Sequence, residues 1–174
     1  MTSNERGLIA RNYFLEGFNC SQAVVLAFSD LISLPKDALL CASSSFGGGM
    51  GRLREVCGAV SGMFLVLGYL RGYSDPKDYE GKKRLYSEIQ ELAGIFTSEY
   101  GSIVCKELLV GVPNTDGTVP EKRSDEYYKK RPCPEQIEFA AKILHEFLQK
   151  PGEIEIKIQS DSSDCIFKEN KELS

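Results

Sequence analysis

Apolar residues recur along most of the chain at the three- and four-residue spacing of a helix face. The clearest case is the segment 76–100, where Leu85, Ile89, Leu92 and Phe96 would line one side of a long amphipathic helix. Helices are predicted in this way over residues 4–16, 20–33, 35–46, 56–70, 76–100, 103–110, 124–131 and 134–149. We therefore predict an all-α fold, a single-domain bundle of about six main helices.

A glycine-rich loop precedes the most apolar of these helices. Gly47, Gly48, Gly49 and Gly51 fall too close together for a regular element and indicate a tight turn or a close approach. The apolar run from Val56 to Leu70 is too short to span a bilayer and predicts a buried central helix. On that helix, Gly58 and Gly62 stand four apart, so another helix could approach closely. This small-residue face could also support a homodimer.

The pattern changes at the C-terminal end. After Pro151 and Gly152, residues 153–158 alternate between polar and apolar positions, and a polar low-complexity stretch follows them. We expect a helical domain over residues 1–150 and an extended or mobile tail over 151–174.

Composition narrows the classes of function. The chain has 174 residues and a formal charge of −4, with a pI near 5.2. No basic run occurs, which argues against nucleic acid as a partner. The N-terminus lacks the charged-then-apolar pattern of a signal peptide, so we expect a cytoplasmic protein without membrane insertion. Six cysteines are many for such a protein and indicate metal ligation or redox chemistry rather than structural disulfides.

Four of the cysteines share a position at the start of a predicted helix: Cys20, Cys57, Cys105 and Cys133. Cysteine is not a favoured residue at that position. The helix dipole there lowers the pKa of a thiol and favours the thiolate. If the four helix ends converge, their sulfurs could bind zinc or an iron–sulfur cluster, or perform thiol–disulfide exchange.

The other two cysteines do not share this position. Cys41 lies within the predicted third helix, where we expect it to be a core residue, and Cys165 lies in the tail. No C-x-x-C pair occurs, so neither a zinc-ribbon nor a ferredoxin pattern applies. The charged segment 124–131 is expected to be a solvated helix face.

The motif at residues 57–62, Cys-Gly-Ala-Val-Ser-Gly, resembles the CGAxxG motif of a known family. Its outer cysteines match too: Cys20 after Gly-Phe-Asn, Cys105 before Lys-Glu-Leu-Leu, and Cys133 ahead of the last helix. The sequence from about residue 5 to 149 is similar to the C_GCAxxG_C_C family of proteins thought to be redox-active. The resemblance implies a small cytoplasmic helical protein whose active set is these four cysteines; it names no substrate.

Two hypotheses about function remain open at this point. The first is a redox protein whose cysteines hold an iron–sulfur cluster or zinc, or cycle between dithiol and disulfide with a redox partner protein. The backbone of Gly47, Gly48, Gly49 and Gly51, together with Gly58, would lie against the sulfurs or the bound group. The second is a non-enzymatic metal-binding or interaction module, accessory to a transporter or a redox partner.

Overall fold

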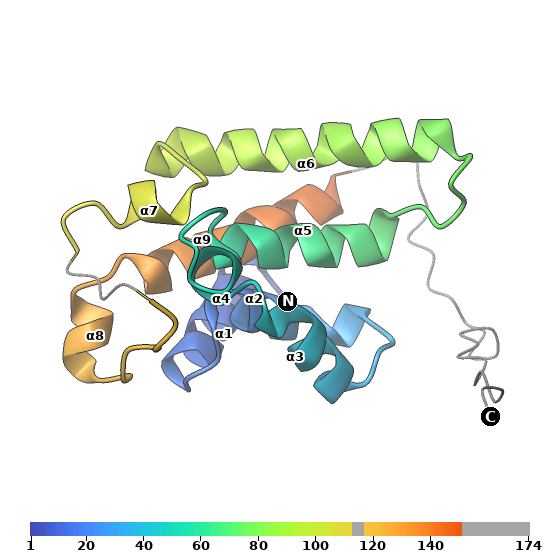
Figure 1. Cartoon of the computed structure of the whole chain (residues 1–174). Coiled ribbons are helices and arrows are strands. Elements are labelled where there is room, and N and C mark those ends of the chain that lie inside the picture. Colours follow the sequence, from blue (N-terminus) through green and yellow to red (C-terminus); the bar gives the residue numbers. More distant parts are fainter. Residues whose placement is uncertain (113–116, 151–174) are drawn as a thin grey trace, which may run out of the picture.

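Helices make up the fold in the computed structural model, which describes residues 1–112 and 117–150 (Figure 1). Within these ranges the only β-type pairing is an isolated antiparallel bridge between Val56 and Val104. This confirms the predicted all-α class. The six main helices are α1 (Ser3–Leu15), α2 (Cys20–Ala27), α3 (Lys36–Ser44), α5 (Gly58–Arg71), α6 (Tyr79–Tyr100) and α9 (Cys133–Gln149). The short elements are η1 (Ser29–Leu31), α4 (Gly47–Met50), α7 (Cys105–Leu108) and α8 (Asp125–Lys129).

The bundle is layered around α5 and α9. Figure 1 shows α6 running along one side of this pair, while α1, α2 and α3 cover the other side. α1 packs against both α9 and α2, and α2 packs against α5 and α3. Fully buried side chains, among them Phe14, Phe28, Met63, Phe96 and Leu144, fill the space between the layers. Burial of such side chains is the main force that holds a helical bundle together.

A capping box fixes where α2 begins. The Asn19 side chain accepts hydrogen bonds from the backbone amides of Ser21 and Gln22, both at 3.0 Å. The Gln22 side chain in turn accepts one from the Asn19 amide at 3.1 Å. These bonds satisfy amides that would otherwise lack partners at the helix start. Cys20 is thereby held as the first residue of α2.

The close approach predicted at Gly58 and Gly62 is made by α2. A Cβ atom added at Gly62 would lie 2.8 Å from the carbonyl oxygen of Ser21 and 3.0 Å from Cβ of Val24. One added at Gly58 would lie 2.9 Å from Cβ of Cys20. Because α2 of the same chain covers this face, it is not open to a second copy. The two glycines therefore serve packing within the chain, and the homodimer stays a prediction.

The glycine-rich segment is a chain of left-handed conformations, as its composition predicts. Gly48 and Gly49 lie inside α4 with φ of 64° and 70°, so this element is not a regular helix. Gly51, Arg52 and Arg54 follow with φ of 60°, 71° and 62°. Arginine rarely adopts such values, and two arginines held there indicate that the surrounding contacts determine the backbone.

Other predictions have mixed outcomes. The helix expected over 20–33 ends as an α-helix at Ala27, and a 3₁₀ turn follows. Cys41 is exposed, so the prediction of a core residue was wrong. No helix in the described ranges is long and apolar enough to cross a membrane. The tail predicted over 151–174 lies outside the described residues.

Candidate functional site

The four cysteines predicted to act together begin four different elements and meet at one end of the bundle. Cys20, Cys105 and Cys133 are the first residues of α2, α7 and α9, and Cys57 immediately precedes α5. The charge on the Cys20 sulfur acts on each of the other three thiols, and Cys57 and Cys105 also act on Cys133. The predicted convergence of the four helix starts is therefore present.

A short antiparallel pairing joins the segments that carry Cys57 and Cys105. The Cys57 amide donates to the carbonyl oxygen of Ile103 at 2.8 Å, and the Cys105 amide donates to that of Glu55 at 2.6 Å. Both bonds flank the Val56–Val104 bridge. Residues on either side of a bridge point to the same face of the pairing, which places both cysteine side chains on one face.

The glycine-rich segment lies directly over the cysteines. A Cβ atom added at Gly49 would come within 2.6 Å of Cβ of Cys105. The backbone amide of Gly48 donates a hydrogen bond to the Cys20 sulfur. Of the glycines expected at the site, Gly48, Gly49 and Gly58 contact cysteines directly. Gly47 lines a cavity together with Cys20 and faces the Asn19 side chain, whereas the nearest atom to a Cβ at Gly51 would be the Ser45 carbonyl oxygen.

The four thiols differ in exposure and in pKa. Cys57, Cys105 and Cys133 are buried, whereas Cys20 is half-buried. The pKa of Cys20 is lowered to about 7, first because the Cys133 thiol donates a hydrogen bond to its sulfur. The positive charge of Arg123 and the Gly48 amide lower this pKa further, while burial opposes the shift.

The other three thiols shift in the opposite direction. Burial raises the pKa of Cys57 to about 12, and nearby sulfur charge adds to the rise. The backbone amides of Ala59 and Val60, at the start of α5, act in the opposite direction and lower this pKa. Burial also raises the pKa of Cys105. The pKa of Cys133 lies well above its ordinary value, first through its hydrogen bond to Cys20 and then through burial. The expectation that every helix-start cysteine favours the thiolate was therefore wrong.

A cavity of about 220 Å³ opens beside the cysteines and is lined by Cys20, Cys105 and Cys133. Four guanidinium groups also line it, those of Arg52, Arg54, Arg123 and Arg131. Arg131 pairs with Glu121, which lies in the same lining. Arg123 sits over the rings of Phe14 and Tyr127, at 4.5 and 4.9 Å from their centroids. The cavity is therefore suited to stabilising negative charge on sulfur.

The sequence patterns did not indicate that Arg123 and Arg131 belong to the site. Arg131 belongs to the charged segment expected to be a solvated face, yet the side chain is buried. Its position two residues before Cys133 was the available signal, because a cation beside a cysteine lowers the pKa of the thiol.

A family profile matches residues 18–147, which include all four converging cysteines and the CGAxxG motif. The chain belongs to the C_GCAxxG_C_C family. The description of this family reads "Putative redox-active protein (C_GCAxxG_C_C)". Comparisons with curated proteins and with solved structures found no match. The family assignment supports redox activity, and it specifies neither metal binding nor disulfide chemistry.

The cysteines of this C_GCAxxG_C_C protein are also candidate metal ligands. Within residues 1–112 and 117–150, no three side chains of His, Cys, Asp or Glu are grouped so that they could hold a metal ion. A zinc ion or an iron–sulfur cluster ordinarily takes four such ligands. Metal or cluster binding by these four cysteines therefore stays a prediction.

Proposed function

We propose that this protein performs thiol–disulfide exchange, with Cys20 as the attacking thiolate and Cys133 as the resolving thiol. The observation that carries the proposal is the pairing of Cys20 with Cys133: both line the same cavity, and the Cys133 thiol stabilises the Cys20 thiolate by a hydrogen bond. It pairs the one partly exposed cysteine of the site with a buried partner. A pKa near 7 leaves about half of Cys20 as thiolate at neutral pH, close to the optimum for an attacking thiol.

The exchange balances in two steps. The Cys20 thiolate attacks one sulfur of a substrate disulfide, a Cys20–substrate bond forms, and one substrate thiolate leaves. Cys133 then gives up its proton to that leaving thiolate and attacks the Cys20 sulfur. This forms the Cys20–Cys133 disulfide and releases the second substrate thiolate. Two electrons pass from the two cysteines to the substrate, and the reverse steps oxidise a dithiol partner.

The pKa values suit this order of events. The largest cause of the raised pKa of Cys133 is its hydrogen bond to Cys20, and the charge of Cys20 also contributes. Both disappear when Cys20 becomes part of a mixed disulfide, because that sulfur then carries no charge. The pKa of Cys133 must fall at that point, which activates the second attack only after the first has occurred.

The other residues of the cavity and the remaining two cysteines have supporting roles in this proposal. The arginines that line the cavity, Arg123 above all, stabilise the Cys20 thiolate and would also attract a negatively charged disulfide. Cys57 and Cys105 stay protonated at neutral pH and could serve as a second dithiol. We place the protein in the cytoplasm, with a redox partner protein supplying or accepting electrons.

The test uses the disulfide 5,5′-dithiobis(2-nitrobenzoate) and follows release of its coloured thiolate. The background carries Cys41→Ser and Cys165→Ser, because exposed Cys41 would also react. With Cys20 and Cys133 intact, we expect two thiolates released per protein and no stable adduct. With Cys133→Ser added, we expect one thiolate and a stable adduct on Cys20, identified by mass spectrometry. Cys20→Ser should abolish the fast phase.

Three results would contradict the proposal. The first is a Cys133→Ser variant that still releases two thiolates. The second is anaerobically purified protein that is brown and loses its colour in Cys20→Ser, which would instead indicate an iron–sulfur cluster. The third is stoichiometric zinc in colourless protein, which would favour a metal-binding module. Metal analysis of the same preparation separates the cluster and zinc outcomes from thiol–disulfide exchange.

A further inference from the structure

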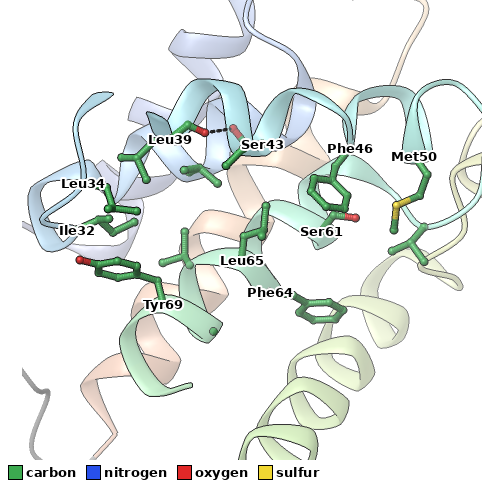
Figure 2. A pocket seen from close by; sticks show the side chains of 15 residues that line it. Ile32, Leu34, Leu39, Ser43, Phe46, Met50, Ser61, Phe64, Leu65 and Tyr69 are labelled. Atoms are coloured by element: carbon green, nitrogen blue, oxygen red, sulfur yellow. Dashed lines mark hydrogen bonds between the residues drawn. The ribbon is translucent and has the colours of Figure 1, made fainter. Parts of the chain in front are cut away.

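A second cavity, larger than the one at the cysteines, lies between α3 and α5. Its volume is about 540 Å³, within the range of small-molecule sites. Figure 2 shows its walls, which include Leu39 from α3, Leu65 from α5, and Phe46 and Met50 from the glycine-rich segment. No charged side chain lines it, so an ionic ligand would lose its hydration without compensation.

Three lining residues carry a side-chain hydroxyl, and two of these already have partners. The Ser43 hydroxyl donates to the Leu39 carbonyl oxygen at 2.6 Å, the dashed line in Figure 2. The Tyr69 hydroxyl accepts a hydrogen bond from the Ser33 amide at 3.0 Å. The third, Ser61 on α5, is 5% exposed, and its oxygen has no hydrogen-bond partner.

An unpaired buried hydroxyl costs about 1–3 kcal/mol, so its presence needs a reason. A bound water is a poor explanation, because a stable buried water needs two to four polar partners. The other hydroxyls that line this cavity are already bonded, and the remaining lining side chains are apolar. A ligand that is apolar over most of its surface and carries one polar group would fill the apolar cavity and give the Ser61 hydroxyl a hydrogen-bond partner.

We propose that this cavity binds a neutral, largely apolar small molecule, with a carbonyl or hydroxyl group hydrogen-bonded to Ser61. The Ser61 oxygen is covered in this structure. The backbone of Phe46 reaches α5 one turn earlier, where its carbonyl oxygen would lie 2.8 Å from a Cβ at Gly58, and its ring lies beside Ser61 in Figure 2. A ligand therefore reaches the hydroxyl when the Phe46 ring turns aside. The site is separate from the cysteine cavity and does not depend on exchange chemistry.

The probe is the neutral naphthalene ketone 6-propionyl-2-(dimethylamino)naphthalene, added to the full chain. Its emission moves to the blue in an apolar site and back to the red when its carbonyl accepts a hydrogen bond. We expect saturable binding with blue-shifted emission. Ser61→Ala should weaken binding about threefold to tenfold, the worth of one hydrogen bond, and shift the bound emission further to the blue.

Ser43→Ala is the matched control, because it removes a hydroxyl that lines the α3 side of the same cavity and is already bonded within α3. It should leave affinity and emission unchanged. Cys20→Ser should bind the probe like the parent protein, so failure of the exchange proposal would not affect this result. Absence of saturable binding, or equal effects of Ser61→Ala and Ser43→Ala, would overturn the proposal. Self-association that the probe cannot disrupt, seen by sedimentation, would assign the groove to a second copy and overturn it too.

Discussion

The glycine at position 49 offers a quantitative test of how the glycine-rich segment holds the site. It has φ of +70°, and an added Cβ would lie 2.6 Å from Cβ of Cys105 and 3.0 Å from the backbone nitrogen and oxygen of Glu55. The Glu55 amide also donates to the Gly49 carbonyl oxygen at 3.2 Å. Because two of these neighbours are backbone atoms, little room exists for them to move aside. The substitution Gly49→Ala should therefore disturb the segment and the cysteine together.

Two costs add at this position. A left-handed conformation costs alanine about 1–2 kcal/mol relative to glycine. Forcing an extra carbon into a packed site costs a further ~1–3 kcal/mol. We expect Gly49→Ala to lower the free energy of unfolding by about 2–5 kcal/mol, a large part of the stability of a domain of this size.

Chemical denaturation measures this loss, and two other glycines separate its parts. Gly51 has φ of +60°, but a Cβ there would meet only the Ser45 carbonyl oxygen at 3.6 Å, an ordinary contact. Gly51→Ala should therefore show the conformational cost alone, about 1–2 kcal/mol. Gly94 lies within α6 with nothing near its added Cβ, and Gly94→Ala should stabilise the protein by about 0.5–1 kcal/mol. If Gly49→Ala costs no more than Gly51→Ala, the argument that the segment presses on Cys105 is wrong.

Three further predictions concern charge. The alkylation rate of Cys20 by iodoacetamide should rise as pH increases through about 7, and the midpoint should move upward in Cys133→Ala, which removes the hydrogen-bond donor; an unmoved midpoint would contradict its role. Arg123→Gln should raise the pKa of Cys20 and slow alkylation at pH 7, whereas Arg123→Lys should retain most of the rate. The pKa of Asp30 is lowered by its hydrogen bond from Arg6, so this pair should contribute stability above the ordinary pKa of 3.8 and lose it as pH falls through the lower folded value. Denaturation from pH 7 to pH 2 should show this loss in the parent protein and not in Asp30→Asn.

The fold was predictable because each main helix carries its own signals. The Asn19–Gln22 box and the spacing of Leu85, Leu92 and Phe96 are local features, and local features are visible in a sequence. Cys41 shows where this reasoning stops. Its neighbours are apolar, yet its side chain is exposed among the described residues. Which face of a helix becomes buried depends on the arrangement of its partners, and helical spacing does not specify that arrangement.

The site was predictable in position and not in charge. The shared position of the four cysteines at helix starts predicted that they would meet. Helices packed in one bundle end near the same plane, so residues at their ends lie close together. Arg123 and Arg131 were missed as site residues. They lie between α7 and α9, and the helical spacing of apolar residues does not predict how this part of the chain reaches the cysteines. The direction of the pKa shift was wrong for Cys57, Cys105 and Cys133, because burial and neighbouring sulfurs outweigh the helix dipole.

The convergence of the four cysteines also changes which protonation state each thiol can adopt. A single thiol at a helix start gains roughly 0.3–1 kcal/mol toward the thiolate from the dipole. In a buried group, a second negative sulfur meets the charge of the first at short range, where little water screens the repulsion. The charge of Cys20 raises the pKa of Cys57, Cys105 and Cys133 alike. Because of this repulsion, the site holds about one thiolate near neutral pH. Cys20 is the cysteine that loses its proton, because it is the least buried of the four, the Cys133 thiol donates a hydrogen bond to it, and Arg123 balances its charge. Unequal thiols are what stepwise exchange requires, since the attacking sulfur must be charged while the resolving sulfur still holds its proton.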